Sequence, residues 1–89
     1  MKFQKVSVNL LKQIGGNMDK EKRKDLMKQG FIILREQFNH RINAWIIASL
    51  TRAGGWTRFG KFYSLRQQEC QARIVEIIRE NPDKYMMDV

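Results

Sequence analysis

The chain contains little cysteine and little histidine, with one of each among its 89 residues. A single cysteine, Cys70, cannot form a disulfide within the chain, so nothing indicates an oxidising compartment. One cysteine and one histidine, His40, also fall short of the four ligands that a structural zinc site needs. We therefore expect no metal site, and we interpret Cys70 as a small buried apolar residue.

Long apolar runs are also missing from the sequence. No stretch reaches the roughly 18 consecutive apolar residues that would indicate a membrane-spanning helix. The N-terminal residues are interrupted by lysine and amide side chains too often to form the apolar core of a signal peptide. We expect a cytoplasmic protein, and a chain of 89 residues is expected to form a single domain over 1–89.

Catalytic and phosphate-binding motifs are absent as well. The pair Gly54-Gly55 precedes an aromatic residue and is not followed by the Gly-Lys-Ser/Thr of a phosphate-binding loop. His40 and Cys70 lack a third group that would orient them as a base and a nucleophile. The carboxylates lie in segments of mixed charge, where an exposed helix surface explains them. The sequence predicts a protein that is not an enzyme and needs no cofactor.

Acidic residues are outnumbered, with 9 Asp and Glu against 17 Lys and Arg, which gives a net charge of +8 at pH 7. Such an excess favours nucleic acid as a partner, followed by an anionic membrane surface or an acidic protein. Membrane-surface binding is disfavoured because no predicted helix has its basic residues opposite a Trp/Leu face. The stretch Thr51–Arg66 contains no acidic residue at all and interleaves aromatic with basic side chains.

Apolar spacing predicts an all-α fold with one long central helix over about 18–53. Successive apolar residues are three or four positions apart, as on one face of a helix. Gly30 interrupts this stripe, but glycine inside a helix costs only about 1 kcal/mol relative to alanine. A helix break at Gly30 is the alternative. The stripe consists of Met27, Phe31, Leu34, Phe38, Ile42, Trp45 and Ser49.

Residues 44–50 are apolar on every side, which places them at the centre of the fold or at a subunit interface and makes a homodimer plausible. A short N-terminal helix is expected at about 8–14. Gly54-Gly55 should end the long helix, and an aromatic-basic loop or short hairpin should follow at 54–63. Ser64 and Gln67 resemble a capping box, which predicts a C-terminal helix over about 65–80 that stops before Pro82.

These features predict a small basic regulatory protein that binds nucleic acid, with DNA favoured over RNA. Aromatic rings can stack on bases for about 1–3 kcal/mol each, and basic side chains neutralise phosphates. The predicted site residues are Arg52, Trp56, Arg58, Phe59, Lys61, Tyr63 and Arg66. A secondary basic patch consists of Lys20, Lys22, Arg23, Lys24 and Lys28. A simpler interpretation is that the aromatic rings close a thin core, with arginine stems over them.

The alternative function is a protein-binding adaptor or inhibitor, possibly of phage or mobile-element type. Its positive charge would occupy the acidic, nucleic-acid-binding groove of a host factor. Trp56 and Arg58 would then be the anchor residues, because tryptophan and arginine are enriched among the residues that dominate protein interfaces. Both functions require exposed aromatic rings beside cations, so the sequence leaves both open.

Overall fold

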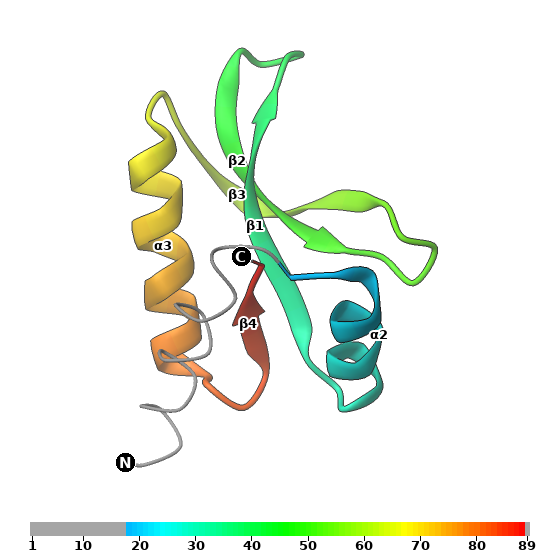
Figure 1. Ribbon diagram of the computed structural model, residues 1–89. Helices are drawn as coiled ribbons and strands as arrows, with labels where there is room; N and C mark the ends of the chain where they lie inside the picture. The colour runs from blue at the N-terminus through cyan, green and yellow to red at the C-terminus, as the bar shows by residue number, and fades with distance from the viewer. Residues whose placement is uncertain (1–17, 89) are drawn as a thin grey trace.

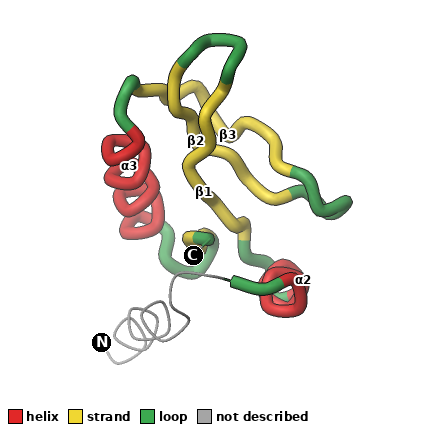
Figure 2. Tube along the Cα trace, turned by 45° about the horizontal axis from the view of Figure 1, so that its top comes forward, coloured by secondary structure: helices red, strands yellow, loops and turns green. Residues whose placement is uncertain are grey.

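The computed structural model describes residues 18–88, which form an α+β fold around a mixed four-stranded sheet (Figures 1 and 2). The predicted all-α fold is therefore wrong. The short helix predicted at about 8–14 lies outside the described residues. In chain order the elements are α2 (Lys20–Lys28), β1 (Ile32–Asn39), β2 (Ala44–Leu50), β3 (Trp56–Ser64), α3 (Gln67–Glu80) and β4 (Tyr85–Met87).

The strands lie in the order β3-β2-β1-β4. β1, β2 and β3 form an antiparallel meander, and β4 joins the outer edge of β1 in parallel. Both views show the strands between the two helices, with α3 along one face of the sheet and α2 at one end of the other face (Figures 1 and 2). Neither of these helices is long and apolar enough to cross a membrane.

α2 ends at Gly30, where the sequence predicts a continuing helix. Gly30 has a φ of 99°, in the left-handed region that glycine enters without steric cost. Its amide donates to the carbonyl of Met27 and the amide of Phe31 to that of Leu26, each at 3.0 Å. These two hydrogen bonds are the pair that defines a Schellman motif at a helix C-terminus. The alternative prediction, a break at Gly30, is the correct one.

The apolar stripe that predicted the long helix also fits the strands. Residues four apart lie on the same face of a strand, because side chains alternate with a period of two. The three-residue steps of the stripe fall at the start of β1 and at the turn before β2, where the chain changes direction. Isoleucine pairs at 32–33 and 46–47 favour strands, since β-branched side chains fit a pleated sheet.

β2 is buried on both faces, as predicted for residues 44–50, although it is a strand and not part of a helix. Ala44, Ile46, Ile47 and Ala48 are each exposed by 3% or less. A central strand covered on both sides has a continuous apolar sequence in place of an alternating one. The prediction that this segment lies at the centre of the fold therefore holds, while its predicted helical conformation does not.

The two turns of the meander use local polar contacts and positive backbone angles. Asn39 Oδ1 accepts from the amides of Arg41 and Ile42 at 2.9 and 3.2 Å, an arrangement typical of Asx turns. In the second turn, the Thr51 amide donates to the Gly55 carbonyl at 2.8 Å, and Gly54 has a φ of 95°. The glycine pair therefore closes a β-hairpin and does not end a helix.

α3 confirms the predicted C-terminal helix, with a start two residues later than expected. Its capping differs from the predicted box. Ser64 Oγ accepts from the Arg66 amide at 3.1 Å and hydrogen-bonds the carboxylate of Glu69, not Gln67. Asn81 ends the helix, directly before the chain's single proline.

Two apolar clusters hold the helices to the sheet. Leu34 and Ile47 pack with Ile74 of α3, and Ile33 packs with Met18 and Leu26 on the α2 side. The neighbours Ile33 and Leu34 therefore face opposite sides of the sheet, as the period of a strand requires. β1 is thus shared between both halves of the core.

Candidate functional site

The aromatic-basic stretch Thr51–Arg66 forms a hairpin turn, the edge strand β3 and the first residues after it. The loop or short hairpin predicted at 54–63 is therefore a strand. Along β3, Arg58 lies opposite Ala48 and Tyr63 opposite Ile46, so β3 has extra residues between these pairs. These residues form a β-bulge, in which Gly60 has a φ of 76°. A bulge of this kind redirects the side chains on either side of it.

The bulge places two phenylalanines of β3 on the α3 side of the sheet. Phe59 contacts Tyr85 edge to face, with ring centroids 5.7 Å apart. Phe62 lies beneath the guanidinium of Arg73, 5.9 Å from its ring centroid. Both rings are half-buried against the cluster around Ile74. Phe59, one of the predicted site residues, thus faces the core on the α3 side of the sheet.

The opposite side of the sheet carries arginine and amide side chains. Directly opposed residues of neighbouring strands share a face. Arg35 opposes Ala48 and Ala48 opposes Arg58, so these form one row across β1, β2 and β3. We call this surface the arginine face. It consists of Arg35, Gln37 and Asn39 of β1, Ala44, Ile46 and Ala48 of β2, and Trp56, Arg58 and Tyr63 of β3.

The arginine face contains no acidic side chain. Glu36 is the only acidic residue within the four strands. It alternates with Arg35 and therefore faces α3, where its charge contributes to raising the pKa of the buried Cys70 thiol. Ion pairs within residues 18–88 involve neither Arg35 nor Arg58. The Asp88 carboxylate lies at the β1 edge of this face, where it pairs with Arg23. The charges of Arg35 and Arg58 therefore stay unpaired among the described residues, whereas that of Arg23 is neutralised.

Arg35 is held over the ring of Trp56. Its guanidinium carbon lies 4.6 Å from the ring centroid, and that of Arg23 lies 5.6 Å from the same ring. Trp56 is half-buried and packs against the α2-side cluster. An arginine stacked on an aromatic face keeps its N–H groups available at its edge. Trp56 therefore positions Arg35 and does not offer an open ring.

Arg58 is exposed and is oriented by its own strand. Its Nη2 donates to the Lys61 carbonyl at 3.3 Å, which uses one of the five guanidinium N–H donors. Tyr63, in the next row of the same face, is 63% exposed. Arg52, Lys61 and Arg66 are exposed as well, in the β2–β3 turn, the bulge and the segment before α3. The structure thus distributes the predicted basic residues around the edges of the arginine face.

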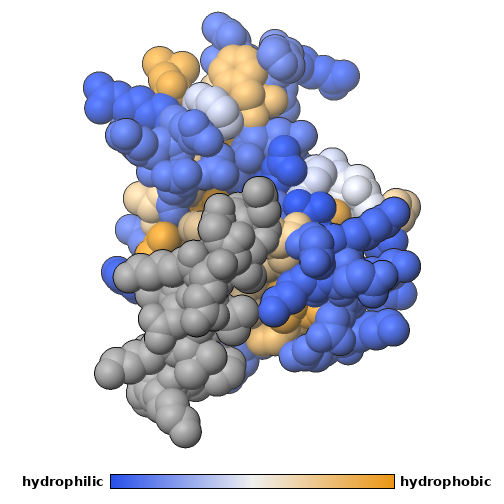
Figure 3. Space-filling view, in the orientation of Figure 1, coloured by the Kyte–Doolittle hydropathy of each residue, from blue (hydrophilic) through white to orange (hydrophobic). Residues whose placement is uncertain are grey.

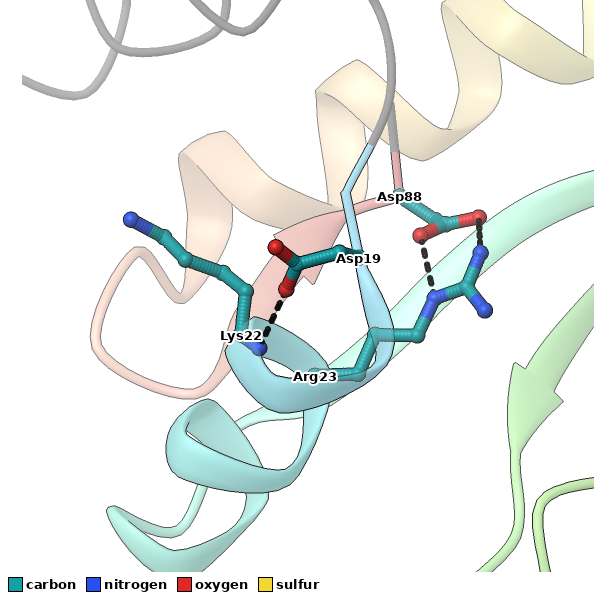
Figure 4. Close-up of polar contacts among 4 residues, drawn as sticks. All are labelled: Asp19, Lys22, Arg23 and Asp88. Atoms are coloured by element: carbon teal, nitrogen blue, oxygen red, sulfur yellow. Dashed lines mark hydrogen bonds and ion pairs between the residues drawn. The ribbon is translucent and has the colours of Figure 1, made fainter.

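The secondary basic patch lies on α2, on the same side of the sheet as the arginine face. Arg23 is already paired, with Nε and Nη2 each 3.0 Å from an oxygen of Asp88 (Figure 4). Lys20, Lys24 and Lys28 are exposed, and Lys22 is half-buried. Hydrophilic side chains gather over α2 in the space-filling view (Figure 3). Arg23 is therefore structural, while the lysines remain accessible.

Sequence reasoning missed Arg35 and Gln37, because both fell inside the predicted long helix. The signal was present in the alternation of Ile33, Arg35, Gln37 and Asn39, which is the period of a half-exposed strand. Ending the helix at Gly30 would have revealed it.

Cys70 is fully buried, as predicted. Burial raises the pKa of its thiol, and the charges of Glu36 and Glu69 raise it further. A thiol with a raised pKa is protonated at neutral pH and is a poor nucleophile. No group of three or more His, Cys, Asp or Glu side chains that could hold a metal ion occurs in residues 18–88.

Comparisons with known proteins give no match. Neither a protein-family model, nor a curated protein, nor a solved structure resembles this chain at a significant level.

Proposed function

We propose that this protein binds nucleic acid through the arginine face. The observation that carries this proposal is the row formed by Arg35, Ala48 and Arg58, two arginines without a carboxylate partner among the described residues. Guanidinium groups form paired hydrogen bonds with phosphate and with base edges. A face that combines such groups, and whose neighbouring carboxylate, Asp88, is already paired with Arg23, attracts a polyanion and repels few of its charges.

The lysines of α2 strengthen this attraction. They extend from α2, which packs on the side of the sheet that carries Arg35 and Arg58, and so add to the positive charge on that side. Each phosphate neutralised by a basic side chain releases counterions, and affinity therefore falls as salt concentration rises. We expect a regulatory protein whose affinity comes from several such contacts together.

Titration of labelled DNA and RNA at two salt concentrations, about 50 and 200 mM, tests the proposal. The double variant Arg35→Gln/Arg58→Gln should weaken binding and reduce the slope of log K against log salt by up to about 2. Arg79→Gln is the matched control, since Arg79 is an exposed arginine of α3. Absence of binding at the lower salt concentration, or an equal effect of the control, would reject the proposal.

An acidic protein remains the second candidate for the same surface. Trp56 is half-buried and so is less suited to act as the interface anchor that the adaptor function requires. Affinity capture from a lysate, with and without nuclease, separates the candidates. Partners that are lost on nuclease treatment support nucleic-acid binding, and a stoichiometric partner that survives it supports the adaptor function.

A further inference from the structure

If the arginine face binds nucleic acid as proposed, the exposure of the aromatic rings of β3 indicates whether it fits single-stranded or double-stranded nucleic acid. Platforms for unpaired strands present exposed rings on which successive bases stack. Of the four rings in residues 56–63, Phe59 and Phe62 face α3 and Trp56 lies under two guanidinium groups. Only Tyr63 is largely exposed. One ring cannot provide a stacking platform.

From this we infer that the ligand is double-helical DNA and that the arginine face enters its major groove. The three strands of the face span about 10 Å between the outer backbones, since neighbouring strands lie about 4.8 Å apart. The major groove of B-DNA is about 12 Å wide and admits a two-stranded β-ribbon, and the outer backbones of these three strands are closer together than the groove is wide. Arg35 and Arg58 on the outer strands would reach towards the base edges and the two walls of the groove.

Side chains of β1 and β3 form the surface that would meet the groove, because the β2 residues of this face, Ala44, Ile46 and Ala48, are each exposed by 3% or less. Arg35 and Gln37 are two residues apart on β1, and therefore about 6.6 Å apart along the strand. This separation matches two base-pair steps of about 3.4 Å.

The side chains of that pair have complementary preferences for bases. Arginine forms paired hydrogen bonds with guanine, and glutamine forms them with adenine. Neither Arg35 nor Gln37 has a side-chain hydrogen bond to another of the described residues. Both side chains are half-buried, and we expect their exposed polar ends to read base edges while the exposed lysines of α2 and Lys61 contact phosphates.

Three labelled ligands test this inference: a short mixed-sequence DNA duplex, its separated strands, and an RNA duplex of the same sequence. We expect the DNA duplex to bind at least about tenfold more tightly than either alternative, because the major groove of RNA is deep and too narrow for side chains to read. Tighter binding of single strands, or equal binding of RNA duplex, would overturn the inference and leave nucleic-acid binding intact. Failure of all three ligands would overturn both proposals.

Selection from a random duplex library tests base reading separately. The wild type should enrich a consensus, and Gln37→Ala should reduce the preference at one position about fivefold or more without changing the salt slope. Gln71→Ala, which removes an exposed glutamine of α3, is the control. No enriched consensus, or a consensus unchanged in Gln37→Ala, would contradict a role of Gln37 in reading bases.

Discussion

The two faces of the sheet use the same three strands for different purposes. On one face the 14-residue α3 packs isoleucines against Leu34, Ile47 and the phenylalanines of β3. On the other, the 9-residue α2 covers only one end, and long polar side chains cover the rest. The comparison shows how a small chain can keep a charged face free. It does so by limiting the apolar packing of α2 to one end of that face and by placing Glu36, the only acidic side chain of its strands, on the other face.

Substitutions that create a cavity on one face or the other should have the largest effects on stability. Ile74→Ala should reduce the free energy of unfolding by about 2–5 kcal/mol, since Ile74 is fully buried at the centre of the α3 face. Urea denaturation measures this loss. Leu26→Ala should mainly release α2, so that amide exchange accelerates in α2 and not in the strands. Global unfolding by Leu26→Ala at the same cost would show that α2 is part of the central core.

The end of α2 provides a second, smaller perturbation. Gly30→Ala should cost about 1–2 kcal/mol, because Gly30 has a φ of 99° while an added Cβ would meet no atom within 4 Å. Gly55→Ala is the matched control, since Gly55 has no left-handed φ and its Cβ would lie 3.6 Å from Thr51 Oγ1. That control should change stability by less than about 1 kcal/mol. Equal losses in the two variants would contradict the role assigned to Gly30.

Breaking the ion pair between Arg23 and Asp88 tests whether the two faces differ in DNA binding. Asp88→Asn removes the charge that holds Arg23 and should cost about 1 kcal/mol of stability. The freed guanidinium lies beside Trp56 at the arginine face, so DNA should bind more tightly and with a salt slope steeper by up to about 0.9. Glu76→Gln, which frees Arg73 on α3, should leave binding almost unchanged. Weaker binding by Asp88→Asn would show that the pair itself shapes the site.

A rise to alkaline pH should have the smallest effect on stability, and it acts through Cys70 on the α3 face. The native pKa of Cys70 is raised above its ordinary value of 9.0. Above that pH the unfolded thiol loses its proton while the native thiol keeps it, so the native state binds more protons and stability falls as pH rises. From about pH 8 to pH 10 the wild type should lose up to about 1 kcal/mol more than Cys70→Ala. Parallel stability curves for the two proteins would contradict burial of Cys70.

The sequence predicts an element correctly where the spacing of its apolar residues fits a helix or a strand but not both. The spacing of Cys70, Ile74, Ile77 and Ile78 fits only a helix, and α3 was predicted accordingly. The stripe from Met27 to Ser49 mixes steps of three and four. Steps of four also fit a strand, so the stripe could not distinguish one long helix from two strands and a turn. The conformation of Gly30 decided between them.

The sequence predicted the types of residue in the candidate site but not how these residues are arranged in space. Basic residues outnumber acidic ones, and in Thr51–Arg66 they are interleaved with aromatic ones. This composition identified Arg58 and Tyr63 as candidate site residues, and these two side chains share a face of the sheet. It could not reveal that the β-bulge at Gly60 returns Tyr63, five residues after Arg58, to the same face as Arg58, because a bulge depends on the partner strand. Nor could it place Arg35 over Trp56, since that contact joins β1 to β3 across the sheet.

The parallel strand β4 gives the chain a particular order of assembly. The meander joins neighbouring segments, whereas Ile32 pairs with Tyr85 from the opposite end of the described chain. Pairing between distant segments forms slowly because a long loop must close first. Until β4 arrives, β1 is an uncovered edge carrying Ile32, Ile33 and Leu34, and such an edge can recruit strands of other chains. The residues Tyr85–Met87 of β4 therefore cover an edge of β1 that would otherwise be open to pairing with other strands.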